Sequence, residues 1–141
     1  MTRPEPRWLG RLAVDEAHFR QIREHGGTHG LRDENALESA LGRPRQRWHY
    51  DQDAMLADLA AAYGFGLAKN HAYVDGNKRI ALVVMVAFLA RNGVDLMATN
   101  HDAFSVVTSV AAGQTSEGEL SAWVQDHVEQ RAIERRTARV M

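Results

Sequence analysis

The sequence predicts an all-α protein with six helices, and three observations support this fold class. Apolar residues recur at helical spacing in most of the chain, and glycines follow three of these periodic stretches. No long alternation of apolar and polar residues predicts a strand. The 141 residues are enough for one domain with its own core. We expect an irregular arm over residues 1–13, a helical domain over residues 14–130 and a tail over residues 131–141.

The first two helices are delimited by capping and breaking residues. The first is predicted over residues 14–25, with Asp15 as a candidate N-cap and a glycine pair after it. The second is predicted to start at Asp33 and to end before Pro44, because the residue before a proline avoids the helical region. This leaves residues 43–51 as a polar connector.

The connector has more than one interpretation. It contains three arginines and two large aromatic residues, which could stack on and grip nucleic acid, or could simply be exposed: Arg43, Arg45, Arg47, Trp48 and Tyr50. The formal net charge of −1 gives no general attraction to nucleic acid or to anionic membranes. We therefore expect no direct nucleic-acid partner and no membrane partner.

Four further helices are predicted in the rest of the chain, over residues of about 53–69, 77–92, 100–112 and from Ser116 onward. Gly64 and Gly66 in the third are expected to pack closely against the helix over residues 77–92, and Ser116 with Glu119 fits a capping box. The apolar run over residues 80–90 predicts a helix buried on all sides, and it is shorter than the about 20 residues that span a bilayer.

Residues 71–79, here called the motif segment, carry most of the chemical information. They contain a histidine, a carboxylate, a glycine, an amide and two cations, and they lead into the apolar helix. The first N–H groups of a helix have no partner within it, and the helix dipole makes that end attractive to anions. The pattern therefore predicts a phosphate site beside a candidate base.

His71 is the candidate general base of this segment. Its ordinary pKa suits proton transfer near neutral pH, although a lone histidine is often a packed core residue. Asp75 is a candidate ligand for Mg²⁺, which one or two carboxylates and substrate phosphates typically hold. The alternative for Asp75 is a cap of the following helix.

The remaining polar residues of the motif segment are candidates for phosphate binding. Gly76 lets the backbone approach a phosphate closely, and the amide of Asn77 can donate to a phosphate oxygen or cap the helix. Lys78 and Arg79 could be a solvated pair. Positive side chains are unfavourable near the positive end of the helix dipole, however. A bound anion between Lys78 and Arg79 therefore accounts for their position better than solvation does.

The motif segment resembles the signature of the Fic/Doc family: His, any, Phe, any, Asp or Glu, Gly or Ala, Asn, Gly or Lys, Arg. Two residues match the Doc (death-on-curing) branch of the family: Lys78, and Leu82, which stands where the AMP-transferring branch has a second arginine. Tyr73 replaces the usual Phe of the signature. Flanking stretches at residues 26–33, 37–44 and 88–93 are also similar. The resemblance covers roughly residues 8–128.

This resemblance implies a six-helix fold around a central buried helix and a specific activity. Doc-type toxins transfer a phosphoryl group from ATP, with Mg²⁺, to a hydroxyl of translation elongation factor Tu, and so inhibit translation. It implies that His71 is the base, that Asp75 holds the metal and that residues 76–79 clamp phosphates. It also implies that residues 43–51 form a flap that pairs with the target. The alternatives are AMP transfer and a binding-only protein without activity.

The resemblance also implies regulation by a separate protein. Many Fic proteins carry an inhibitory helix with Ser or Thr, three residues, then Glu-Gly or Glu-Asn. Here Gly113 precedes Glu117-Gly118, and Gly30 precedes Glu34-Asn35, so neither stretch fits. An antitoxin acting in trans is therefore expected. The absence of cysteine and of an apolar signal-peptide core fits a cytoplasmic location.

Overall fold

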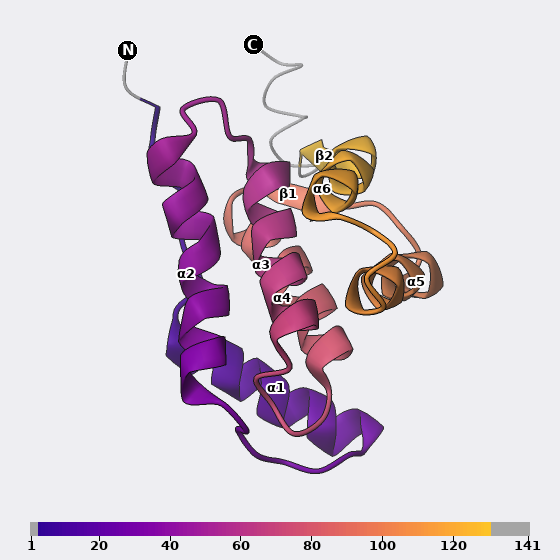
Figure 1. Cartoon of the computed structure of the whole chain (residues 1–141). Helices are drawn as coiled ribbons and strands as arrows, with labels where there is room; N and C mark the ends of the chain where they lie inside the picture. Colours follow the sequence, from indigo (N-terminus) through magenta and orange to yellow (C-terminus); the bar gives the residue numbers. More distant parts are fainter. Residues whose placement is uncertain (1–2, 131–141) are drawn as a thin grey trace.

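The structure, a computed structural model, describes residues 3–130 and is almost entirely helical (Figure 1). The prediction of an all-α fold with six helices is confirmed for these residues. The predicted tail over residues 131–141 lies outside the described residues. The elements are α1 (Arg11–His25), α2 (Glu34–Tyr50), α3 (Leu56–Asn70), α4 (Asn77–Arg91), β1 (Val94–Leu96), α5 (Asn100–Ala111), α6 (Glu117–Asp126) and β2 (Val128–Gln130).

Two short strands were not predicted. β1 and β2 pair in antiparallel fashion, with Val94 opposite Gln130 and Leu96 opposite Val128. Each strand has three residues, which is too short for an alternating pattern to be recognised in the sequence. The pair joins the end of α4 to the end of α6.

The helix at the centre of the fold is α3. It packs against α2, α4, α5 and α6, and most of its residues are fully buried. The prediction that the helix containing residues 80–90 is buried on all sides is wrong, because Val86 of α4 is 40% exposed. An apolar sequence alone does not fix burial, since apolar atoms make up more than half of a folded protein's surface.

Gly64 of α3 lies where α4 approaches most closely. A Cβ atom added there would lie 2.3 Å from Sδ of Met85, which is fully buried. The predicted close contact with α4 is thus confirmed at Gly64. The same prediction is wrong for Gly66, because a Cβ atom added there would lie 3.1 Å from Cα of Ala40 in α2.

This geometry predicts opposite effects for two helical glycines. Gly64→Ala should lower the free energy of unfolding by about 1–2 kcal/mol, because overpacking against Met85 outweighs the better helix propensity of alanine. Gly42→Ala in α2 should raise it by up to about 1 kcal/mol, since no atom lies within 4 Å of the added Cβ. Urea unfolding of both variants measures the difference, and equal effects would contradict the packing argument.

α2 continues through Pro44, so its predicted end and the predicted connector over residues 43–51 are both wrong. A proline inside a helix costs about 3 kcal/mol, and tertiary contacts outweigh this cost. Pro44 is buried, and Arg43 and Arg47 pair with Glu117 of α6 at 2.6 and 3.5 Å. The guanidinium of Arg45 lies over the ring of Trp8.

Two helix starts follow the predicted capping chemistry. Asp33 caps α2 by accepting from Ala36 N, and Ser116 with Glu119 forms the predicted capping box of α6. The prediction for the first helix start is wrong. α1 begins at Arg11, and Asp15 lies inside the helix, where its carboxylate binds the side chain of Arg11.

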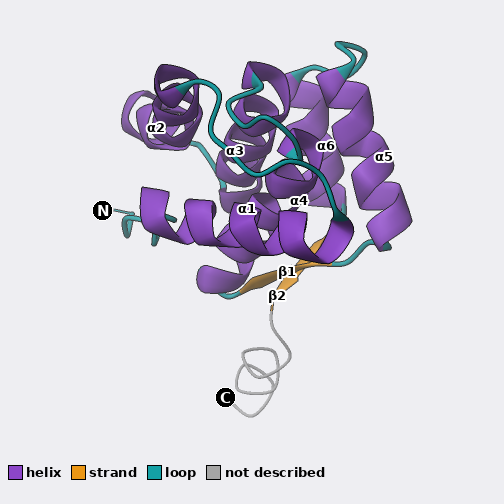
Figure 2. Ribbon diagram, turned by 90° about the horizontal axis from the view of Figure 1, so that it is seen from below, coloured by secondary structure: helices purple, strands orange, loops and turns teal. Residues whose placement is uncertain are grey.

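The fold brings two loops together at one end of the molecule. The loop joining α1 to α2 and the loop joining α3 to α4 lie at the end crossed by α1 (Figures 1 and 2). We call residues 26–33 the covering loop and residues 71–76 the motif loop. Leu31 and Tyr73 form an antiparallel bridge between them. Within residues 3–130, no helix combines the length and apolar character needed to cross a membrane.

Candidate active site at the start of helix α4

The motif loop turns the chain sharply between α3 and α4. His71 caps the end of α3 with φ of 49°, and it is the one non-glycine residue among residues 3–130 with positive φ. Gly76 caps the start of α4 with φ of 79°. The left-handed conformation is unfavourable for a residue with a Cβ atom, and such strain persists where the surroundings hold it in place.

The covering loop supplies part of this restraint through the backbone. The carbonyl of His71 accepts from Nε of Arg32 at 2.9 Å, and the carbonyl of Ala72 accepts from the backbone N–H groups of Arg32 and Asp33. The N–H of Val74 donates to the carbonyl of Gly30. The motif loop is therefore fixed by residues about 40 positions earlier in the chain.

Asn77 holds the motif loop closed from within. Its Nδ2 donates to the carbonyl of Tyr73 at 2.9 Å, and its Oδ1 accepts from the N–H of Tyr73 at 3.0 Å. The reading of Asn77 as the N-cap is wrong, because Asn77 is the first residue of α4 and Gly76 is the cap. Its side chain thus shapes the loop, and a role in phosphate binding stays a prediction.

Asp75 is exposed on the motif loop, and its carboxylate is oriented by the covering loop. Oδ2 accepts from the N–H of Thr28 at 2.8 Å. The reading of Asp75 as the helix cap is wrong, since Gly76 has that position. A carboxylate has about four lone-pair sites, so this bond leaves the group able to bind a metal ion.

A pocket of about 450 Å³ lies beside the start of α4. Five of the six predicted site residues line it: His71, Asp75, Gly76, Asn77 and Lys78. The volume is within the usual range for small-molecule sites. The pocket therefore combines a histidine, a carboxylate and the N-terminus of a helix.

Arg79 is the predicted residue that does not line this pocket. Its guanidinium lies 5.1 Å from the ring centre of Phe104 on α5, and Nζ of Lys78 lies 6.0 Å from the same ring. Both cations thus extend from the first turn of α4 towards α5. Binding of phosphate by Arg79 stays a prediction.

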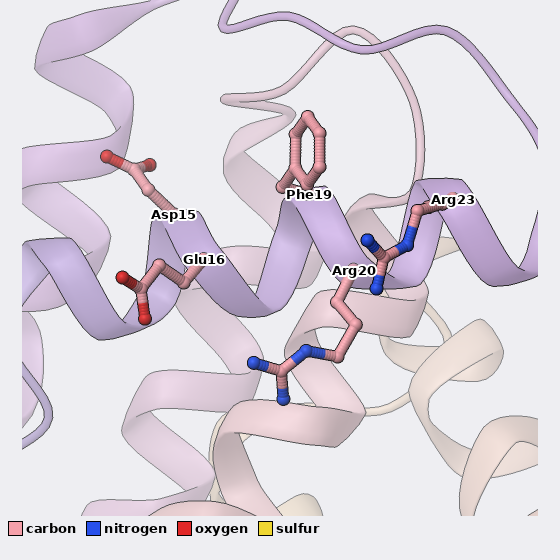
Figure 3. Close-up of a pocket in the computed structure, with 5 residues that line it drawn as sticks. All are labelled: Asp15, Glu16, Phe19, Arg20 and Arg23. Carbon is pink, nitrogen blue, oxygen red and sulfur yellow. The ribbon is translucent and has the colours of Figure 1, made fainter.

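A second pocket of similar volume lies on the surface of α1 (Figure 3). The five labelled side chains that line it all come from this helix: Asp15, Glu16, Phe19, Arg20 and Arg23. The lining contains no histidine and no helix N-terminus, so it offers neither a base nor an anion cradle. The pocket at α4 is the better candidate for an active site.

The described residues limit how a metal ion could be held. Residues 3–130 contain no group of three or more histidine or acidic side chains arranged to bind a metal. Mg²⁺ does not require such a group, because it commonly binds one carboxylate, water and substrate phosphates. Asp75 at the mouth of the pocket fits this mode of binding.

Comparison with known proteins identifies the family of this chain. A model of the Fic/DOC family matches residues 8–89, which include α1 to α3, the whole motif segment and most of α4. The chain belongs to the Fic/DOC family. The earlier assignment to this family from the motif segment is therefore confirmed.

Two relatives place the chain near the Doc branch of the Fic/DOC family. It is 35% identical over 79 residues to "Protein kinase doc" of Escherichia phage P1, a match that covers 56% of this chain and 63% of the relative. It is 48% identical over 75 residues to "Toxin Doc" of Mycolicibacterium smegmatis, covering 52% and 57%. The chain thus spans about three fifths of the length of these relatives.

Several residues at this Fic/DOC site were not found from the sequence. The wall of the pocket on α5 consists of Thr108, Ala111 and Ala112, which lie on one helix face but outside the family match. Thr28 and Arg32 act on the motif loop from the covering loop. Each of these hydrogen bonds has a backbone atom as its donor or its acceptor. Many residue types could make such bonds, so no sequence pattern predicts them.

Proposed function

We propose that this protein is a Doc-like toxin that transfers the γ-phosphoryl group of ATP to a hydroxyl of a target protein. The observation that carries the proposal is the pocket in which His71 and Asp75 lie beside the start of α4. The names of the two Doc relatives, a kinase and a toxin, support the same activity. As the target we propose translation elongation factor Tu, which the resemblance to the Doc branch implies.

In the proposed reaction the target hydroxyl attacks the γ-phosphorus. A bond forms between its oxygen and phosphorus, and the bond from phosphorus to the bridging oxygen of ADP breaks. His71 accepts the hydroxyl proton, and ADP leaves with the electron pair. The free N–H groups at the start of α4, together with Lys78 and Arg79, bind the phosphate oxygens.

Asp75 would hold the Mg²⁺ ion in this reaction. When bound, the ion supplies positive charge to the phosphate oxygens. The carboxylate is held by Thr28 and is exposed at the pocket, as this role requires. The remaining ligands would come from ATP and water.

The covering loop is the proposed site for the target backbone. The sequence suggested residues 43–51 for this role, but these residues belong to the end of α2 and its C-cap. The covering loop already pairs with the motif loop through Leu31 and Tyr73. A target segment added alongside it would bring its hydroxyl to His71 by β-strand addition.

AMP transfer remains the alternative reaction. Lys78 fills the place where AMP-transferring members usually have glycine, and Leu82 replaces their second arginine. A long cation and an aliphatic side chain should change how the triphosphate lies, with its terminal phosphate nearest His71.

Labelled ATP separates the two reactions. ATP labelled at the γ-phosphate should label elongation factor Tu, and ATP labelled at the α-phosphate should not. Mass spectrometry of the product should find one added phosphate. Label from the α-phosphate alone, with an added AMP, would replace the kinase proposal by AMP transfer. The absence of both labels would support a binding-only protein.

We also propose an antitoxin as the partner of this protein. Glu117, which would be the glutamate of an inhibitory helix, instead pairs with Arg43 and Arg47. Exposed apolar side chains on the packed helices α1 and α4, Leu12, Phe19 and Val86, provide surface for a partner. Both observations favour inhibition in trans.

The antitoxin proposal predicts growth arrest when the protein is expressed alone. Co-expression of a cognate partner should restore growth, and a His71→Asn variant expressed alone should allow growth without any partner. Colony counts and a check of soluble, folded protein measure this. Normal growth with the folded wild-type protein alone would contradict the proposal.

A further inference from the structure

Tyr73 is the residue at which the motif segment departs from the family signature, and its hydroxyl has a specific partner. The side chain is 3% exposed, and its hydroxyl donates to Oδ1 of Asp15 in α1 at 2.7 Å. Burial and the adjacent Asp15 carboxylate raise the pKa of Tyr73, so the hydroxyl stays protonated and remains a donor. A phenylalanine would fill the same space without this bond.

His18 contacts both Tyr73 and the predicted metal ligand. It is 4% exposed, and its ring stacks on Tyr73 with 3.7 Å between ring centres and an angle of 10°. Its Nε2 lies 2.7 Å from the carbonyl oxygen of Asp75. A carbonyl only accepts, so Nε2 carries the hydrogen and donates. His18 therefore binds the backbone of the residue whose side chain faces the pocket.

The far end of this arrangement is anchored between two helices. Nε of Arg11 lies 2.8 Å from Oδ2 of Asp15, and the same guanidinium contacts Glu34 and Glu38 of α2 at 2.5–2.9 Å. Asp15 projects from α1 and is one of the residues that line the pocket on that helix (Figure 3). The Asp15 carboxylate, which accepts the hydrogen bond from the Tyr73 hydroxyl, is thus held by Arg11. Arg11 is itself held by the two glutamates of α2.

The end of the motif loop lies directly on α1. A Cβ atom added at Gly76 would lie 3.0 Å from Cδ1 of Ile22 and 3.5 Å from Nε2 of His18. A Cβ atom added at Gly27 would lie 3.3 Å from Cβ of Asp75. Asp75 is thus held from two sides, by α1 and by the covering loop.

We propose that Asp15, His18 and Tyr73 form a positioning unit that fixes the backbone of Asp75 and directs its carboxylate into the pocket. The unit rests on the proposed function, in which Asp75 holds Mg²⁺. It acts through Asp75 and contacts neither phosphate nor target. Residues that orient metal ligands typically change metal affinity or activity by about 10–100-fold when they are replaced.

The N–H of Thr28 provides a readout that does not depend on activity. It donates to Oδ2 of Asp75, so its hydrogen exchange reports the orientation of this carboxylate in the metal-free protein. His18→Phe keeps a ring to stack on Tyr73 but removes the donor. It should raise the exchange rate of the Thr28 N–H by about tenfold, the size expected for one lost hydrogen bond.

Two further variants and one control make the test specific. His18→Gln keeps a donor and should restore most of the protection at Thr28. Tyr73→Phe should raise exchange in the same direction, and the double variant with His18→Phe should show less than the sum of the two effects, because both belong to one unit. His25→Phe, on the exposed last turn of the same helix, should change nothing.

Transfer kinetics complete the experiment. His18→Phe should lower kcat by about 10–100-fold with little change in KM for ATP, and His18→Gln should recover part of the loss. Raised Thr28 exchange together with a wild-type protein that transfers nothing would support the positioning unit and reject the proposed function. Thr28 exchange in His18→Phe equal to that in His25→Phe would overturn the positioning unit, whatever the kinetics.

Discussion

Replacement of His71 should lower the rate of phosphoryl transfer by about 10²–10⁴-fold, the loss typical of a missing general base. His71 lines the pocket at the start of α4, where it can accept the proton of the target hydroxyl. His71→Asn is the sharper variant, because asparagine tolerates the left-handed backbone that this position requires. His71→Ala should lose as much activity and also some stability.

The single-turnover rate of phosphoryl transfer is measured with labelled ATP for each variant. The affinity of each variant for ATP is measured in a separate experiment. Both variants should still bind ATP, since the helix N-terminus and the cations are unchanged. His49→Ala, an exposed histidine in the last turn of α2, is the matched control and should transfer at the wild-type rate. A His71→Asn protein within tenfold of wild type would remove His71 as the base.

The sequence was most informative where the chemistry is local. The glycine pair after residue 25 marked the end of the first helix, Asp33 and Ser116 marked helix starts, and each prediction depended on bonds within a few residues. The motif segment is also local. Nine consecutive residues contain all six predicted site residues, and the fold brings five of them to one pocket.

The errors arose where tertiary contacts override local preference. Pro44 predicts a helix end, but α2 continues to Tyr50, and arginines on both sides of the proline, Arg43 and Arg47, pair with Glu117. The pairing partner lies 70 residues later or more, and a local reading cannot include it. The same reason explains why residues 43–51 were interpreted as a connector and a flap.

The supports of the motif loop could not be predicted for a different physical reason. Arg32, Thr28 and His18 act on backbone carbonyls or on one carboxylate, and many residue types can make such bonds. These three residues contact the motif loop only because α1 and the covering loop pack against it in the folded protein. Asp15 illustrates the point, because a residue expected to cap a helix instead receives the hydroxyl of Tyr73.

Asp75→Asn should lower transfer at ordinary Mg²⁺ concentrations by about 10²-fold or more, as loss of one charge-stabilising group typically does. The substitution isolates the charge, because the amide oxygen of asparagine can still accept from the N–H of Thr28. The Thr28 N–H should therefore stay largely protected, with a smaller rise in exchange than in His18→Phe, because a neutral acceptor is weaker than a carboxylate but the covering loop should stay in place. The rate should recover in part when the Mg²⁺ concentration is raised, since a neutral ligand binds the ion more weakly.

The measurement is the transfer rate as a function of Mg²⁺ concentration for wild type and variant. Asp53→Asn, an exposed carboxylate between α2 and α3, controls for the loss of one negative charge elsewhere on the surface. If Asp75→Asn transfers normally at low Mg²⁺, the role of Asp75 is confined to holding Thr28, and the metal must bind the phosphates without it. If the variant is inactive and Thr28 exchanges at least as fast as in His18→Phe, the loss comes from a displaced loop and the metal role is unsupported. The loss of activity is assigned to the charge of Asp75 only if the transfer rate falls while the Thr28 N–H shows that the covering loop has not moved.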